Sequence, residues 1–197
     1  VMSLKTRFGN LGNILDFDNL TEDNIYVLES PILTNSQFKK FKNIFKDKIK
    51  VIDCTFDINS PLKNRIEKIR DEAETAVREG SNNLILSDKK INESRASIPS
   101  VLAVGAVHSH LVKLGLRGYC SINVESSDIL DTHSFAVLIG VGATTLNPYL
   151  VIDSIYERFE KKLFGNLDFE TCVTNFKKSI DNGLLKIMSK MGISVIS

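Results

Sequence analysis

The stretch SNNLILSDKKINESRASIPSVLAVGAVHSHLVKLGLRGYCSINVESS, residues 81–127, decides the fold. It contains a short apolar run at 84–86 and a second expected buried strand at 120–124, and polar residues end each of them. Between them, residues 99–114 are apolar nearly all round, as expected of a helix that packs on a sheet. Parallel strands buried on both faces are continuously apolar, and a crossover helix connects them. The stretch therefore predicts a parallel strand–helix–strand unit and an α/β fold.

Two helical segments carry patterns that predict a buried face. On the 99–114 helix, the stripe expected to pack on the sheet consists of Val101, Leu102, Gly105, Ala106, Ser109 and Val112. At 62–79 the apolar residues recur at spacings of three and four, and they are Leu62, Ile66, Ile69, Ala73, Ala76 and Val77. Charged residues such as Lys68 occupy the opposite face of this second helix, so it should lie half in water. Gly80 is expected to end it in a left-handed conformation.

Further elements continue the alternation of strands and helices. The expected strands lie at 25–28, 49–56 and 144–146, and the expected helices at 36–45, 133–139 and 149–164. Asn35 or Ser36 should cap the first of these helices, whereas the first 18 residues are irregular and should lie extended on the surface. We expect a domain over residues 1–165 with a parallel β-sheet and crossover helices, layered as an incomplete β/α-barrel or like flavodoxin. C-terminal helices over residues 166–197 should lead toward another domain.

Composition excludes some classes of partner. The 197 residues include 25 basic and 24 acidic side chains, for a net charge of +1. This balance provides no basic field for nucleic acid and no polybasic anchor for a membrane. No apolar run reaches the roughly 20 residues that span a bilayer, and the beginning of the chain does not resemble a signal peptide. We expect a cytoplasmic or plastid stromal protein and, because Val1 precedes Met2, a piece of a longer one.

Residues that could bind metal or nucleotides form no strong pattern. Cys54, Cys120 and Cys172 lie far apart in the sequence and are expected to be reduced core thiols. His108 and His110 are two residues apart on a helix, so they point in different directions and predict packed or surface histidines rather than a metal pair. The glycine-containing stretches match neither a P-loop nor a dinucleotide-binding fingerprint.

Polar side chains follow the expected parallel strands at the point where each strand ends. These are Ser87, Asp88, Glu125, Ser126 and Asn147. The carboxyl ends of parallel strands are where α/β proteins bind ligands. Polar residues are also the ordinary way to end a strand, so this pattern leaves both a ligand site and a purely structural role open.

Several motifs together resemble the central domain of the large subunit of glutamate synthases. They are LSD at 86–88, SIPSVLAVGAVHSHLVKLGLR at 97–117, VES at 124–126, MSLKTRFGNLGNIL at 2–15, LESPILTN at 28–35, FAVLIGVGA at 135–143 and NPYL at 147–150. The tail KSIDNGLLKIMSKMGIS, residues 178–194, resembles the junction into the flavin-binding domain of that family. One departure is Ser109, which interrupts the longer histidine run usual in the family and weakens any role for a histidine cluster.

The resemblance implies a division of labour within a larger oxidoreductase. In this family an amidotransferase domain releases ammonia from glutamine, and the ammonia travels through an internal tunnel to an FMN-binding domain. There it condenses with 2-oxoglutarate, and FMN supplied with electrons by an iron–sulfur cluster reduces the imine to L-glutamate. The central domain joins the two sites and helps to line the tunnel. The fragment itself should be catalytically inert, with no catalytic, cofactor-binding or metal-binding residues of its own.

The same resemblance implies candidate residues for the wall of the ammonia tunnel. Met2, Ser3, Thr34 and Asn35 lie in segments that the family places toward the ammonia route, and they are small, apolar or uncharged. An ordinary loop role for the four residues remains equally open. The alternatives for the whole chain are a self-contained FMN- or phosphate-binding β/α module and a pure scaffold. A small electron-supplying subunit or ferredoxin is a further expected partner, and the sequence fixes neither the electron donor nor the oligomeric state.

Overall fold

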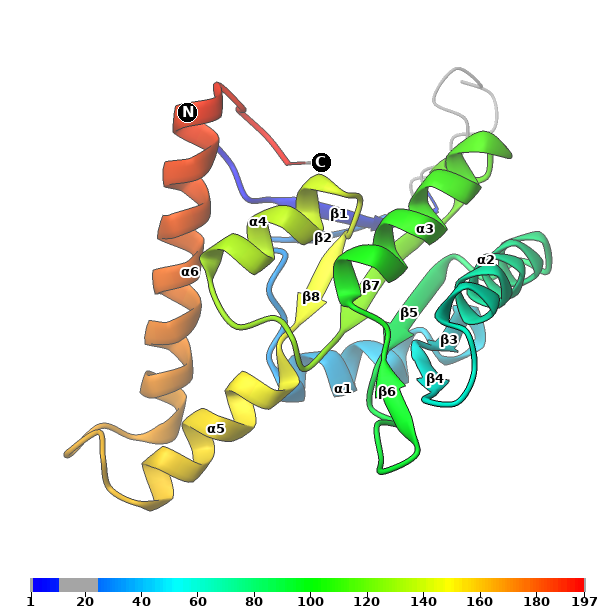
Figure 1. The fold of residues 1–197 in the computed structure, drawn as a ribbon. Coiled ribbons are helices and arrows are strands. Elements are labelled where there is room, and N and C mark those ends of the chain that lie inside the picture. The colour runs from blue at the N-terminus through cyan, green and yellow to red at the C-terminus, as the bar shows by residue number, and fades with distance from the viewer. Residues whose placement is uncertain (1, 11–24, 197) are drawn as a thin grey trace.

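The computed structural model describes residues 2–10 and 25–196 of the chain (Figure 1). Its strands are β1 (Thr6–Gly9), β2 (Ile25–Leu28), β3 (Ile49–Asp53), β4 (Thr55–Asp57), β5 (Asn83–Ser87), β6 (Arg95–Ser97), β7 (Ser121–Glu125) and β8 (Thr145–Asn147). Its α-helices are α1 (Asn35–Ile44), α2 (Leu62–Arg78), α3 (Ser100–Lys113), α4 (Thr132–Gly140), α5 (Tyr149–Glu160) and α6 (Phe169–Met191). Within the described ranges, no helix is long and apolar enough to cross a membrane.

A parallel four-stranded sheet in the order β3-β5-β7-β8 forms the centre of the fold. This confirms the α/β prediction and the central position of β5 and β7. The segment just before α1 adds a single parallel bridge, in which Ile32 pairs with Leu146 beside β8. Because the strands follow one another in chain order, the sheet has no topological switch point and corresponds to part of a β/α-barrel rather than to flavodoxin.

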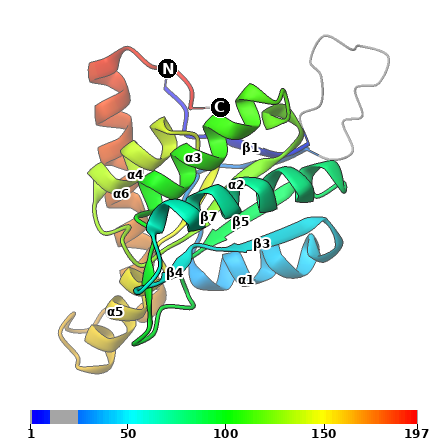
Figure 2. The ribbon, with the colours of Figure 1, turned by 45° about the vertical axis from the view of Figure 1, so that its right-hand side comes forward.

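The two faces of the sheet are covered by different elements. Helices α2, α3 and α4 pack on one face and bury a large apolar core that includes Leu84, Leu86 and Val124 of the sheet. On the other face lies α1 (Figure 2), and its phenylalanines form a smaller cluster with Phe8 of β1 and Ile85 of β5. The alternation of Leu84, Ile85 and Leu86 between the two cores explains why this strand is apolar throughout.

Helix α6 stands beside the sheet and packs against α4 and α5 (Figure 1). Asp168 caps its first turn by accepting a hydrogen bond from Thr171 N. Ile180, Leu184 and Met188 of α6 enter the same core as the sheet. The domain boundary near Gly165 falls in the loop between α5 and α6, and it remains a prediction.

Several boundaries differ from the sequence prediction. Strand β2 pairs antiparallel with β1 outside the parallel sheet, and the start of the chain is partly buried because Leu4 and Phe8 pack inward. The strand expected at 49–56 breaks at Cys54 into β3 and β4, which pairs antiparallel with β6. The N-cap of α1 is neither Asn35 nor Ser36 but Thr34. The irregular segment predicted at 1–18 and the family motif at 2–15 lie partly outside the described residues, as does residue 197 at the end of the predicted 166–197 segment.

The predicted buried stripe of α3 is largely wrong, because Ala106 is the only one of its six members that is buried. Val101, Leu102 and Val112 are between 41% and 52% exposed, whereas Val104, Val107 and Leu111 are fully buried. The error has a physical cause, because a helix that is apolar nearly all round has too weak an amphipathic pattern to mark its inner face. The strongly patterned α2 does bury the predicted residues Ile69 and Ala73.

The contrast between the two faces of α2 generates a stability prediction. Ile69→Ala deletes a side chain that is completely buried, so it should lower the free energy of unfolding by about 2–5 kcal/mol. Lys68→Ala, on the exposed face of the same helix, should change it by less than about 0.5 kcal/mol. Urea denaturation of the two variants measures both values. Equal midpoints would contradict the assigned packing of α2.

Candidate functional site

The polar residues predicted at the strand ends do come together at the carboxyl edge of the sheet. Ser87, Asp88, Glu125, Ser126 and Asn147 are each no more than 7% exposed. Asp88 follows β5 directly, and its backbone N–H donates to Glu125 O on the neighbouring strand. Parallel pairing in register places these residues side by side, and they form a buried polar layer.

Glu125 is the centre of this layer. Its carboxylate accepts hydrogen bonds from Lys42 Nζ of α1 at 2.9 and 3.0 Å and from Ser87 Oγ of β5 at 2.8 Å. Lys89 Nζ lies 3.1 Å from Glu125 Oε1. Burial alone would raise the pKa of Glu125, but the hydrogen bonds from Lys42 and Ser87 and the two lysine charges outweigh burial and lower it. Glu125 is therefore an ionised and fully partnered buried carboxylate.

Asp88 organises a second group of contacts beside the first. Its Oδ2 accepts from Ser127 N, Ser127 Oγ and Ser126 Oγ, each at 2.8 Å. Burial, together with the nearby carboxylate of Asp88, raises the pKa of Tyr149 to about 12. The Tyr149 phenol is consequently neutral, and its ring lies 4.9 Å below Lys89 Nζ. The arrangement fixes the loops after β5 and β7 and the start of α5.

Asn35 joins the carboxyl edge to the helices around it. Its Oδ1 accepts from Asn147 Nδ2 at 2.9 Å, and its Nδ2 donates to Asp153 Oδ1 of α5 at 2.8 Å. Asn147 Nδ2 also donates to Leu33 O at 3.0 Å. Asn35 thus connects α1, β8 and α5 and has partners for both ends of its amide.

Thr34 is the N-cap of α1. Its hydroxyl accepts from Gln37 N, and the Gln37 side chain accepts in return from Thr34 N, which completes a capping box. Thr34 and Asn35 also line a cleft of about 780 Å³ between α1, α5 and α6. The other walls of this cleft include Ile152, Tyr156 and Val173.

Met2 and Ser3 lie near the C-terminal end of α6, whereas the cleft with Thr34 and Asn35 lies near its N-terminal end. Ser3 N donates to Ser194 O at 2.9 Å, just after α6 ends, and Met2 is 37% exposed. Thr34 instead shares its cleft with Phe169 at the start of this helix, whose 23 residues span about 34 Å. The four nominated residues therefore form two separate pairs. Their role in a tunnel remains a prediction.

Three residues of the carboxyl edge were missed by the sequence reasoning, namely Lys42, Lys89 and Tyr149. The ammonium group of Lys42, on α1, turns toward Glu125 and lies 4.9 Å from the centre of the Phe38 ring. Tyr149 carried a usable signal, because it comes two residues after the end of β8. No local pattern could have paired Lys42 with a residue 83 positions away.

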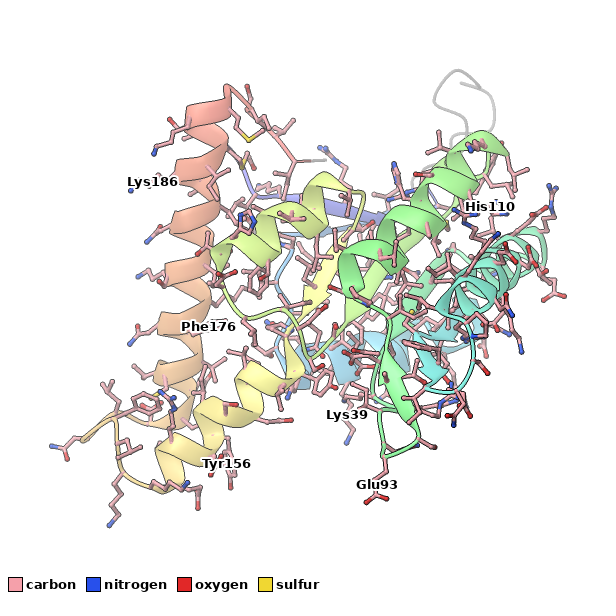
Figure 3. The ribbon with its side chains drawn as sticks, viewed as in Figure 1. Lys39, Glu93, His110, Tyr156, Phe176 and Lys186 are labelled. Atoms are coloured by element: carbon pink, nitrogen blue, oxygen red, sulfur yellow. The ribbon has the colours of Figure 1, made fainter. Side chains whose placement is uncertain are left out.

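His108 and His110 contact neighbouring side chains, and the three cysteines are buried. Arg117 Nε donates to His108 Nδ1 at 3.1 Å, and burial, assisted by the Arg117 charge, lowers the pKa of His108. His110 Nε2 lies 2.9 Å from Glu74 Oε2 (Figure 3). Burial raises the pKa of Cys54 to about 12 and that of Cys120 to about 11, so both remain protonated thiols. Among the described residues, no three His, Cys, Asp or Glu side chains are grouped to hold a metal ion.

The lowered pKa of Glu125 generates a pH prediction. The carboxylate stabilises the fold above its unfolded pKa of about 4.3, and this stabilisation disappears as the pH falls through the lower folded value. Glu125→Gln should therefore cost about 2 kcal/mol at pH 7, and its stability should approach that of the original protein below about pH 4. Urea denaturation between pH 7 and 3 measures the difference. A difference that did not change with pH would show that the Glu125 charge has no stabilising role.

Comparison with known proteins assigns the chain to a family. The model of the glutamate synthase central domain matches residues 1–197. The chain is 52% identical over 200 residues to the NADPH glutamate synthase large chain of Azospirillum brasilense, and 38% identical over 212 residues to the chloroplastic ferredoxin-dependent glutamate synthase of Oryza sativa subsp. japonica. In both comparisons the alignment covers 100% of this chain but only 13% of the relative.

Among solved structures, a dihydroorotate dehydrogenase (DHODH) from Eimeria tenella in complex with ferulenol is 15% identical, with a TM-score of 0.48. That match covers 75% of this chain and 35% of the other, and it is too distant to indicate function. The match of the family model over every residue confirms the resemblance stated from the sequence motifs. The chain belongs to the glutamate synthase central domain family.

Proposed function

We propose that this chain is the connecting domain of a glutamate synthase, which makes L-glutamate from 2-oxoglutarate and ammonia released from glutamine. The observation that carries the proposal is the full-length match to the central domain family, together with relatives of which the chain spans about 13%. The domain would hold an amidotransferase domain and an FMN-binding domain of the same polypeptide in register. In this role the domain positions the two catalytic sites and contributes part of the wall between them.

The chemistry of the described residues supports a connecting role over a catalytic one. The carboxyl edge of the sheet, where a β/α module would bind phosphate, is occupied by its own ionised Glu125 and by buried Asp88. Lys42 and Lys89, the lysines beside this edge, already pair with Glu125 and are not free to bind the phosphate of FMN, which counts against the alternative of a self-contained flavin module. The buried, protonated thiols of Cys54 and Cys120 do not fit an iron–sulfur cluster, which needs several adjacent thiolates. FMN and the cluster belong to other parts of the parent protein.

The positions of the four candidate tunnel residues along α6 support a passage for ammonia beside this helix. The cleft with Thr34 and Asn35 lies at the start of this helix, and Met2 and Ser3 lie at its end. Between these two points, Ser30 Oγ donates to Asp181 Oδ1 at 2.7 Å. We infer that the passage follows the strip between the chain before α1 and the helix, and that the neighbouring domains close its open side. This arrangement gives both separated pairs of residues a place on one route.

The electron donor and the location lie outside what this domain determines. The names of the relatives include NADPH-, NADH- and ferredoxin-dependent enzymes, and all of them match the whole of this chain. A domain shared by all three types does not select the donor, so we place donor choice in the flavin domain, a small subunit or ferredoxin. We propose a cytoplasmic or stromal location for the parent enzyme.

Filling the cleft tests the passage in the intact glutamate synthase that contains this domain. Thr174 lies on the exposed wall of the cleft and, unlike Thr34 and Asn35, caps or crosslinks no element, so Thr174→Trp should narrow the space without unfolding the protein. Glutamine hydrolysis should continue near the original rate, while glutamate formation from 2-oxoglutarate should fall about tenfold or more. Both rates are measured in the same reaction mixture.

Asn175→Trp provides the matched control. Asn175 is exposed one position further along α6 and does not line the cleft, so this variant should keep the original ratio of the two rates. If Thr174→Trp also kept that ratio, the cleft would not be part of the ammonia route. If both variants changed the ratio equally, the effect would be a general disturbance of α6 rather than obstruction.

A further inference from the structure

Strand β3 is the open edge of the parallel sheet. It pairs with β5 on one side, and no described strand pairs with its other side. Open edges expose unpaired backbone N–H and C=O groups, which natural proteins cover, charge or use for pairing with another strand. Val51, in the middle of β3, is 51% exposed.

The hydrogen bonds at the end of β3 show which backbone groups point outward. In a parallel pair, the N–H and C=O of one residue point to the same side, and successive residues alternate. Cys54 N donates to Ser87 O of β5 at 2.7 Å, so even-numbered residues face β5. Ile49, Val51 and Asp53 therefore direct their backbone groups away from the sheet. Consistent with this, Asp53 O accepts a hydrogen bond from the Arg65 guanidinium instead of from a strand.

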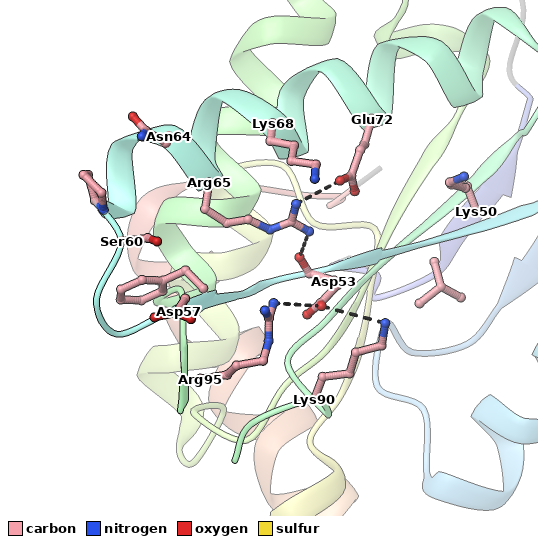
Figure 4. Close-up of a pocket in the computed structure, with 13 residues that line it drawn as sticks. Lys50, Asp53, Asp57, Ser60, Asn64, Arg65, Lys68, Glu72, Lys90 and Arg95 are labelled. Carbon is pink, nitrogen blue, oxygen red and sulfur yellow. Dashed lines mark hydrogen bonds and ion pairs between the residues drawn. The ribbon is translucent and has the colours of Figure 1, made fainter. Parts of the chain in front are cut away.

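A groove of about 740 Å³ runs beside this edge, between β3, α2 and the β4–β6 ribbon (Figure 4). Its cationic wall residues are Lys50, Arg65, Lys68, Lys90 and Arg95. Its anionic wall residues are Asp53, Asp57 and Glu72. Cations therefore outnumber anions in the groove, and its electrostatic potential should favour an acidic occupant.

The ion pairs inside the groove leave part of this charge unmatched. Arg65 Nη1 lies 2.8 Å from Glu72 Oε1, and Arg95 Nη2 lies 3.1 Å from Asp53 Oδ2 (Figure 4). Lys90 Nζ also lies 3.8 Å from Asp53 Oδ2. Among the described residues, Lys50 on β3 and Lys68 on α2 take part in none of these ion pairs, so both ammonium groups line the groove without an acidic partner.

We propose that an extended, acidic segment of the parent polypeptide, from outside these 197 residues, pairs with the outer edge of β3 and occupies this groove. Added strands gain affinity from backbone hydrogen bonds and specificity from the side chains around them, and this site offers both. Because the chain spans about 13% of its relatives, most of the parent polypeptide is available to supply the segment. The inference rests on the proposed role as one domain of a longer enzyme, and it adds a specific point of attachment.

Residue-resolved hydrogen exchange on the intact enzyme tests the proposal, and the alternation along β3 provides an internal reference. The amides of Lys50 and Ile52 bond to β5 in any case and should exchange slowly. If a segment pairs with the edge, the Val51 amide should exchange within about tenfold of these two. A Val51 amide that exchanged near the rate of an unstructured peptide would overturn the proposal.

Charge reversal tests the acidic character of the segment. Lys50→Glu combined with Lys68→Glu in the intact enzyme should speed exchange of the Val51 amide at least about tenfold. The matched control is Lys178→Glu with Lys186→Glu, two exposed lysines of α6, of which Figure 3 labels Lys186. Neither lysine lines the groove, so this variant should leave the Val51 amide unchanged. Unchanged protection in the groove variant would rule out an acidic occupant.

Dilution distinguishes the parent chain from a second copy. The exchange of the Val51 amide is measured again after the enzyme has been diluted a hundredfold, to a concentration at which it does not dimerise. Slow exchange that persists after this dilution supports a segment of the same polypeptide. Protection that disappears on dilution would assign the edge to a second molecule and overturn the proposal. Neither result depends on the ratio of glutaminase to synthase rates, so this inference and the ammonia passage can fail separately.

Discussion

The arrangement of this domain depends on the interactions of one buried carboxylate, that of Glu125, with the lysines and the serine around it. It is 3% exposed and ionised, and it draws together α1 through Lys42, β5 through Ser87 and the following loop through Lys89. An unpaired charge at this depth would be strongly destabilising, so the sheet, α1 and the loop must keep their relative positions. The apolar cores on the two faces provide most of the burial, whereas this ion network fixes how α1 lies across the strand ends.

This use of the carboxyl edge agrees with the connecting role that we propose for the domain. In β/α proteins the carboxyl ends of parallel strands usually present polar groups to a ligand. Here most of the same polar groups pair with one another: Asp88 Oδ2 accepts hydrogen bonds from Ser126 and Ser127, and Asn147 donates to Asn35. Among the described residues, the buried Asp88 Oδ1 has no hydrogen-bond partner. The result is a rigid edge to which α1, α5 and, through α5, α6 are attached. Rigidity of this kind suits a domain that keeps two distant active sites in a fixed relation.

How much could be predicted from the sequence depended on whether the signal was local. The strands β5 and β7, the helix α2 and the polar strand ends follow from runs and spacings of neighbouring residues, and the structure confirms them. The capping box of Thr34 and Gln37 was also readable as a threonine followed three residues later by glutamine, although Asn35 and Ser36 were chosen instead. The face of α3 was not readable, because valine, leucine and alanine occupy both of its sides.

The candidate site was less predictable for a related reason. Its strand-end members were identified, but the partners that decide its function come from α1 and α5, and tertiary folding alone brings them together. Likewise, only the structure separates Met2 and Ser3 from Thr34 and Asn35 by the length of α6. The resemblance of the sequence motifs identified the family, whereas the contacts at the carboxyl edge of the sheet could be described only from the structure.

A double-mutant cycle between Lys42 and Glu125 tests the central claim most directly. Free energies of unfolding would be measured at pH 7 for the original protein, Lys42→Met, Glu125→Gln and the double variant. If the pair is a buried structural link, the double variant should lose less stability than the two single variants together, with a coupling energy of about 1–3 kcal/mol. Coupling within about 0.3 kcal/mol of zero would contradict the claim that this ion pair closes the carboxyl edge of the sheet.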